Sequence, residues 1–167
     1  MSENNKIVYI SVDNGLGGAI CVMTNRKIIE LIVMPVLRTT DTKGEYDINT
    51  IVQFLSKYKE NSVLIIEKCH AMPLLGSVQA FSFGKSYGLM IGIAAALKIP
   101  YHIIHAKTWQ KEMFRDINSD NTKQASVFVA KQLFPEQSFL ATERSKKPHD
   151  GMTDSCLLGL YAERHNL

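Results

Sequence analysis

Residues 6–19, KIVYISVDNGLGGA, form the segment around which the rest of the chain is predicted to fold. Residues 8–12 are rich in β-branched and aromatic side chains, which predicts a well-covered extended strand. The strand ends at Asp13, and the glycine-rich residues that follow predict a tight turn into a second strand. An acid at the end of a buried strand is costly to bury unless a cation or hydrogen bonds compensate it. The remaining sequence is therefore expected to supply a partner for Asp13.

The composition is that of an ordinary globular protein, with 46% hydrophobic and 21% charged residues. A chain of 167 residues is long enough for one hydrophobic core, so we expect a single domain over residues 1–167. The polar N-terminus predicts no signal peptide, and the longest strongly apolar run, residues 88–97, is too short to span a bilayer. Cys21, Cys69 and Cys156 lack metal-like spacing, so we expect reduced thiols, a cytoplasmic location and no membrane partner.

The net charge of +3 is unevenly distributed. Residues 106–149 contain eight Lys and Arg against five Asp and Glu, whereas the remainder contains eleven of each. This excess suits an anionic partner such as nucleic acid, and a solvated helical surface explains it equally well.

The predicted elements run in the order strand, strand, strand, helix, strand, helix, strand and three helices. The first three strands are joined by short turns, which is typical of an antiparallel meander. The later alternation of helices and strands indicates an α/β fold with a mixed sheet and helices on both faces. The first predicted strand ends at Asp13, and the others cover 19–24, 27–34, 63–66 and 101–105. The predicted helices run from the N-cap Asp47 to about residue 60, over 77–97, over 107–114, from Asp120 or Thr122 to 133, and over 150–164. A polar loop is predicted at 37–46.

Two of these helices carry informative patterns. Gly84, Gly88 and Gly92 recur every fourth residue in the helix over 77–97. Glycine costs about 1 kcal/mol relative to alanine in a helix, so a one-sided row indicates a very close neighbour. The candidates are a strand beneath the helix, a partner helix or a nucleic-acid backbone. In the helix before Phe134, the spacing predicts the following core residues: Ala125, Val127, Phe128, Ala130 and Leu133.

Four acids form the most informative pattern in the chain. Asp13 and Glu67 each end an apolar strand, and the two strands are expected to be neighbours in the sheet. Asp150 and Asp154 lie four residues apart, on one face of the last helix. Four carboxylates at one place cannot all stay charged without cations, and hard oxygen ligands select Mg²⁺ or Mn²⁺.

Each acid also has a purely structural interpretation. Asp13 suits an Asx turn, Glu67 suits an ion pair with a lysine, and Asp150 suits a helix N-cap. Asp154, in the first turn, would complement the helix dipole. The joint pattern of two strand acids and two helix acids is more specific than any one of them.

Four segments of the sequence resemble the RuvC-type Holliday junction resolvases of the ribonuclease H-like superfamily, in particular the compact forms found in phages and viruses. The segments are VDNGLGGA, VLIIEKCHAMP, FSFGKSYGLMIGIAAAL with AKTWQK, and KKPHDGMTDSCLLG. The resemblance covers nearly the whole chain. It implies a five-stranded ribonuclease H-like sheet, a homodimer, and an endonuclease that resolves four-way DNA junctions by metal-dependent phosphodiester hydrolysis, with paired nicks that leave 5′-phosphates.

The resemblance also implies roles for individual residues. Asp13, Glu67, Asp150 and Asp154 fall on the acidic positions of the family, where they would hold two Mg²⁺ ions, with Mn²⁺ as a substitute. Lys107 and Lys123 fall near family lysines that support DNA binding or cleavage. The expected DNA contacts are Lys85, Phe81, Phe83, Lys111, Arg144, Lys146 and Lys147.

The sequence departs from the family pattern at several positions. Asn14 stands where a proline usually follows the first acid, and His70 stands where an aromatic residue often follows the second. Phe81 or Phe83 would supply that stacking instead, unless both belong to the helix core. The spacing of the helix acids differs slightly from the usual one, and in some relatives a histidine holds the first of these places. His149 therefore competes with Asp150 as a metal ligand, with Asp150 favoured.

Three other functions remain as alternatives. The first is a broader ribonuclease H-like nuclease that acts on RNA–DNA hybrids, forks or flaps. The second is a non-catalytic junction-binding protein, which is disfavoured because all four acids are present. The third is an actin-like ATPase, which requires two domains and is disfavoured by the chain length, so no nucleotide cofactor is expected.

Overall fold

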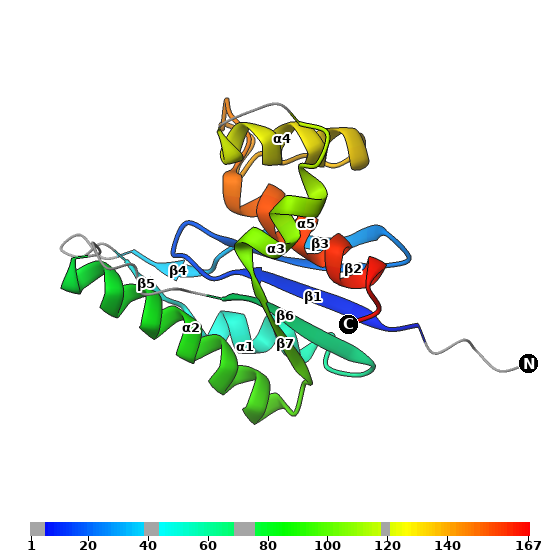
Figure 1. Cartoon of the computed structure of the whole chain (residues 1–167). Helices are drawn as coiled ribbons and strands as arrows, with labels where there is room; N and C mark the ends of the chain where they lie inside the picture. Colours follow the sequence, from blue (N-terminus) through cyan, green and yellow to red (C-terminus); the bar gives the residue numbers. More distant parts are fainter. Residues whose placement is uncertain (1–5, 39–43, 69–75, 118–120) are drawn as a thin grey trace, which may run out of the picture.

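The computed structural model describes residues 6–38, 44–68, 76–117 and 121–167, and in it five strands form one mixed sheet (Figure 1). The strand order is β3-β2-β1-β6-β7. β1 pairs antiparallel with β2 and parallel with β6, β2 pairs antiparallel with β3, and β6 pairs parallel with β7. The bounds of these strands are Val8–Asp13 for β1, Ala19–Thr24 for β2, Lys27–Val33 for β3, Ser62–Lys68 for β6 and Tyr101–His105 for β7. The predicted α/β class and mixed five-stranded sheet are confirmed.

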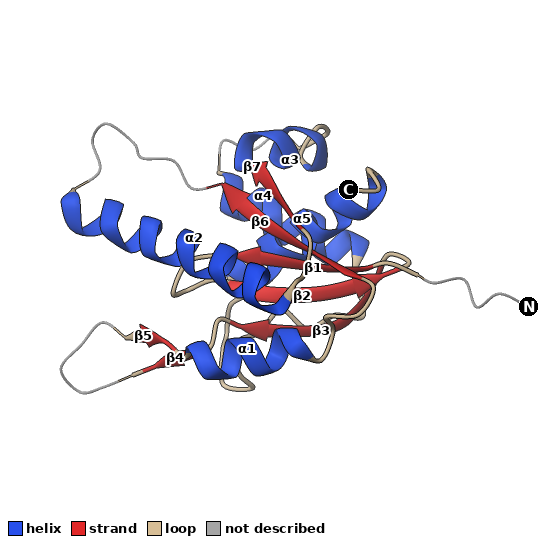
Figure 2. Ribbon diagram, turned by 90° about the horizontal axis from the view of Figure 1, so that it is seen from below, coloured by secondary structure: helices blue, strands red, loops and turns tan. Residues whose placement is uncertain are grey.

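Helices cover both faces of the sheet, as predicted (Figure 2). One face packs against α1 (Ile48–Ser56) and α2 (Ser77–Leu97). The other packs against α3 (Ala106–Met113), α4 (Thr122–Leu133) and α5 (Asp150–Arg164). Successive residues of a strand point to opposite faces. In β1 and β6, residues 10, 12, 64 and 66 therefore face α1 and α2, whereas residues 9, 63 and 65 face α5.

Local signals account for most helix boundaries. Asp47 caps α1 by accepting a hydrogen bond from the Thr50 amide, as predicted. The predicted bounds of α2 and α5 match the structure. α4 begins after Asn121, whose side chain accepts hydrogen bonds from the Lys123 and Gln124 amides. The alternative start at Asp120 lies outside the described residues.

Two predicted boundaries are wrong. The loop over 37–46 contains part of a small hairpin, in which β4 (Val36–Leu37) pairs antiparallel with β5 (Glu45–Tyr46). α1 ends at Ser56 rather than near residue 60. Tyr58 continues the helical spacing because it still packs on the core that α1 covers, although it lies beyond the helix.

The core face of α4 also differs from the prediction. Phe128 is 51% exposed and Leu133 is 40% exposed, whereas Ser126 and Val129 are buried. The helix is turned so that a serine, rather than its largest apolar side chain, faces α5.

α2 is unusually apolar for a helix with so much exposed surface. The segment Ala80–Leu97 has a mean hydropathy of 1.3 and is long enough to cross a membrane by length and composition, beyond the shorter run noted in the sequence. Met90, Ile93 and Ala94 nevertheless pack into the core. Because α2 connects β6 to its sheet neighbour β7, we interpret it as the crossover helix of a parallel strand pair.

Candidate active site

Asp13 and Glu67 lie side by side at the C-terminal ends of neighbouring parallel strands. Val12 of β1 is in register with Ile66 of β6, so the two acids follow that pair at the same edge of the sheet. Both acids continue the alternation of residues 9, 11, 63 and 65, which face α5. The predicted pairing of the two strand acids is confirmed by this register.

The first turn of α5 reaches these acids because it lies directly against the turn between β1 and β2. A Cβ atom at position 151 would lie 2.6 Å from the Cα of Gly18 and 2.8 Å from the carbonyl oxygen of Gly17. Only glycine allows this approach. Further along α5, the Ser11 hydroxyl donates a 2.6 Å hydrogen bond to the Ser155 carbonyl. These small-residue contacts place Asp150 and Asp154 over the strand ends.

α4 contributes two polar side chains to the same place. Lys123 Nζ lies 2.9 Å from Asp150 Oδ2 in an ion pair. Ser126, three residues later and fully buried, donates a hydrogen bond to Asp154 and lies 2.9 Å from the Thr153 hydroxyl. The buried serine face of α4 therefore orients the second helix acid.

The electrostatics show that the four carboxylates act on one another. Burial raises the pKa of Asp13 to about 6, with Asp150 adding to the rise and Lys123 opposing it. Burial raises the pKa of Glu67 to about 7, assisted by Asp13 and Asp154. The pKa of Asp154 rises to about 6, chiefly by burial and further by Asp13 and Asp150. These acids cannot all be charged at neutral pH without a compensating cation.

The donor chemistry of the cluster fits a divalent cation. Four carboxylates supply the hard oxygen ligands that Mg²⁺ and Mn²⁺ prefer, and their mutual repulsion would be relieved by bound positive charge. Within residues 6–38, 44–68, 76–117 and 121–167, no group of three or more His, Cys, Asp or Glu side chains stands close enough to hold an ion. The coordination geometry is therefore not preformed, although the four carboxylates lie close enough to interact electrostatically.

The N-cap of α5 bears on the alternative of His149 or Asp150 as a metal ligand. His149 Nδ1 accepts a hydrogen bond from the Met152 amide at 3.3 Å, so its neutral ring carries the proton on Nε2. Coordination through Nε2 would require the other tautomer and the loss of this cap. Asp150 is coupled to Asp13 and Asp154, so it fits better as the ligand.

Other predicted site residues lie outside this cluster. Lys107, in the first turn of α3, is exposed and forms no ion pair with a described acid. Lys85 is paired with Glu45 of β5 instead of being free for a phosphate. Phe81 and Phe83 are 74% and 41% exposed, so neither belongs to the helix core. The remaining predicted DNA contacts, all exposed, are Lys111, Arg144, Lys146 and Lys147. His70 lies outside the described residues.

Three residues near the acids were not predicted from the sequence. Asn14, the departure from the family proline, donates from Nδ2 to the Glu67 carbonyl at 2.8 Å and so joins the ends of β1 and β6. Ser126 could have been found from its position three residues after Lys123, which puts both on one helix face. Trp109 of α3 is fully buried. Burial raises the pKa of Glu67, and the indole N–H of Trp109 acts in the opposite direction.

The chain was compared with protein-family models, curated proteins and solved structures. No protein-family model matches the chain, and no curated protein matches it. RuvC of Thermus thermophilus in complex with a Holliday junction substrate is similar, with a TM-score of 0.60 and 10% identity over 95% of this chain and 96% of that chain. Another Thermus thermophilus RuvC structure has a TM-score of 0.56 and 11% identity, again over 95% and 96%. The chain therefore has a RuvC-like fold of the ribonuclease H-like type.

Proposed function

We propose that this chain is a metal-dependent DNA endonuclease that resolves four-way junctions by paired nicks that leave 5′-phosphates. The observation that carries the proposal is the convergence of Asp13, Glu67, Asp150 and Asp154 at one edge of the sheet, beside Lys123, in a RuvC-like fold. Phosphodiester hydrolysis needs this combination, because charge develops on the phosphate and on the leaving oxygen.

Asp13 and Glu67 would hold one Mg²⁺ or Mn²⁺ ion, and Asp13 with Asp150 and Asp154 would hold a second. When bound, the ions would supply Lewis-acid stabilisation of the phosphate and a more acidic water. Ser126 keeps Asp154 in place through its buried hydroxyl. The divided roles explain why the acids come from three different elements.

Lys123 is the cation best placed to stabilise negative charge on the substrate. Its hydrogen bond to Asp150 raises the pKa of its ammonium group, so it stays protonated at neutral pH. Asp150 also fixes the direction of this flexible side chain. Lys107 is the less favoured candidate because no described acid orients it. Arg144, Lys146 and Lys147 are exposed and would contact backbone phosphates, which predicts strong salt dependence of DNA binding.

Cleavage of a labelled four-way DNA junction in Mg²⁺ or Mn²⁺ tests the proposal. A duplex, a Y-fork and an RNA–DNA hybrid of matched length are assayed beside it, with Glu67→Gln as the inactive control. We expect symmetric cuts in the junction, at least about tenfold faster than in the duplex, and no cuts by Glu67→Gln, because the carboxylate charge is lost but the volume is kept. Cleavage of the RNA–DNA hybrid but not of the junction would show that the hybrid, and not the junction, is the substrate. Tight junction binding without cleavage in either ion would refute catalysis.

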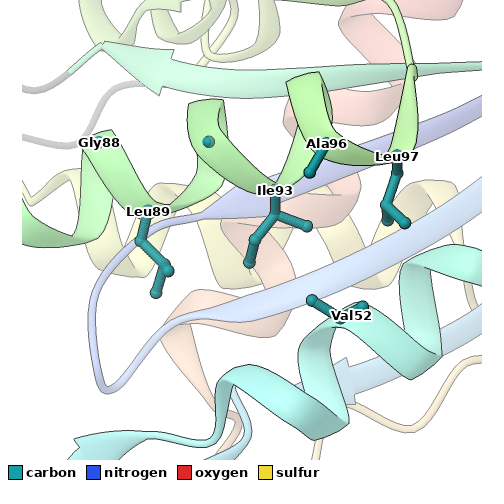
Figure 3. Close-up of a pocket in the computed structure, with 7 residues that line it drawn as sticks. Val52, Gly88, Leu89, Ile93, Ala96 and Leu97 are labelled. Carbon is teal, nitrogen blue, oxygen red and sulfur yellow. The ribbon is translucent and has the colours of Figure 1, made fainter.

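We also propose that the chain acts as a homodimer through α2. Gly88, Gly92, Ile93 and Leu97 of α2 line, with Val52 of α1, an apolar groove of about 340 Å³ (Figure 3). A Cβ atom added at position 84, 88 or 92 would have no neighbour within 4 Å. The glycine row therefore does not pack on the sheet, and the interpretation that placed a strand beneath it is wrong. A second copy would cover this surface and supply the second nick.

Gly88→Arg is expected to convert the dimer to a monomer and to replace paired nicks by single nicks. The arginine meets no atom of its own chain, and replacing a helical glycine stabilises the helix by up to about 1 kcal/mol, so the monomer should fold normally. Light scattering after size-exclusion chromatography measures the mass. Phe128→Arg adds the same charge at an exposed apolar position on the opposite face and should leave the dimer intact. A dimer that survives Gly88→Arg would exclude α2 as the interface.

A further inference from the structure

Trp109 is the one tryptophan of the chain, and its side chain is completely buried in α3. α3 follows β7 directly, and Ile104 of β7 is in register with Glu67. The ring therefore lies in the core on the face of the sheet to which Glu67 also points. The indole packs edge to face against Phe114, with ring centroids 5.6 Å apart.

The indole N–H is the polar part of this otherwise apolar environment. Nε1 is buried, and its donor finds no hydrogen bond of ordinary geometry. A buried donor left in this state destabilises the folded protein. Phenylalanine would fill much of the same space without that cost. The charged acceptor that the fold brings to this place is Glu67, because its strand partner Ile104 lies near the end of β7, just before α3, and packs in the same cluster as Trp109. The direction in which Trp109 acts on the pKa of Glu67, opposite to the rise caused by burial, agrees with this placement.

We propose that Trp109 is a positioning residue: when a divalent cation binds, its unpaired indole N–H donates to the Glu67 carboxylate and holds it in the orientation that binds the cation. The inference deepens the proposed metal-dependent function and rests on it. A carboxylate that binds a metal through one oxygen commonly accepts a hydrogen bond at the other, and such outer contacts are typically worth 10- to 100-fold in metal affinity or activity. Ser126 of α4 already donates a hydrogen bond of this kind to Asp154.

Because Trp109 is the single tryptophan of this chain, its indole N–H can be followed without interference from another. In ¹⁵N-labelled protein the indole N–H gives one cross-peak, which is followed during titration with Mg²⁺, while calorimetry measures the binding heat separately. We expect the cross-peak to shift with the calorimetric midpoint and to lose this shift in Glu67→Gln. A cross-peak that stays fixed while calorimetry detects binding would overturn the inference and leave the proposed function intact.

Substitution gives an independent test. Trp109→Phe removes the N–H and keeps an aromatic ring, and we expect about 10-fold or greater weakening of Mg²⁺ binding with a melting temperature close to that of the wild type. Met113→Leu alters the buried face of the same helix without touching the indole N–H and should bind Mg²⁺ as the wild type does. Equal affinities in Trp109→Phe and the wild type would overturn the inference. If Trp109→Phe does not fold, the cross-peak titration decides alone. Absence of binding heat with both Mg²⁺ and Mn²⁺ in the wild type would overturn the proposed function and the inference together.

Discussion

Replacing Asp13 by asparagine is expected to reduce junction cleavage by about 10³-fold or more, with little change in junction binding. Asp13 is the acid that acts on all the others: it raises the pKa of Glu67 and Asp154 and interacts with Asp150. Asparagine has nearly the same shape but no negative charge, so it would weaken both proposed ion sites at once. The loss is measured by single-turnover cleavage, with binding measured by fluorescence anisotropy in EDTA.

The matched control for this prediction is Asp47→Asn. It makes the same chemical change at an exposed acid that caps α1 and takes no part in the cluster. Asparagine caps helices about as well as aspartate, so we expect the activity of the wild type. If Asp13→Asn keeps more than about a tenth of the wild-type cleavage activity, the carboxylate cluster does not take part in the reaction.

The metal-free protein is expected to lose stability as the pH rises from about 4 to about 7. Unfolding restores the ordinary carboxyl values of 3.8 for Asp13 and Asp154 and 4.5 for Glu67, whereas the folded values are about 6, 6 and 7. Between these limits the folded state binds more protons than the unfolded state, so the free energy of unfolding falls with rising pH and levels off above about 7. For Asp13 alone the loss is roughly 3 kcal/mol.

Two comparisons in EDTA isolate this effect. At pH 8, Asp13→Asn should melt about 5 °C or more above the wild type, because it removes a buried charge. Mg²⁺ should raise the melting temperature of the wild type more than that of the variant. The pKa shift of Asp47 has the opposite sign, because hydrogen bonds from the Thr50 side chain and amide lower its pKa. Asp47→Asn should therefore not stabilise the protein at pH 8. A melting temperature that rises steadily from pH 5 to pH 8, or a destabilised Asp13→Asn, would contradict the prediction.

The opposite effects on stability and activity follow from the same chemistry. A cluster that binds cations strongly must hold negative charges close together in a partly dehydrated place, which destabilises the protein when no cation is present. Asp13 and Glu67 are held side by side by the parallel register of β1 and β6.

The sequence predicted local structure well where local forces decide it. Residues 77–97 and 150–164 are helical as predicted, and Asp47 caps α1. Prediction failed where packing and local pattern disagree. In α4 the apolar spacing favours burial of Phe128 and Leu133, but the structure buries Ser126, which is needed next to Asp154. Periodicity counts apolar side chains and does not register a hydroxyl that is buried for its hydrogen bond.

The sequence by itself determined the order of the elements, the mixed sheet, and the positions of Asp13 and Glu67 at strand ends, because apolar runs and strand alternation are local features of the chain. Only the tertiary structure decided which groups approach these acids. The Lys123–Asp150 pair, the role of His149 as a cap and the burial of Trp109 next to Glu67 join segments from α3, α4, α5 and the sheet. Such contacts depend on how helices dock, which is set by close approaches such as that of Gly151 to Gly18, and no local period encodes that docking.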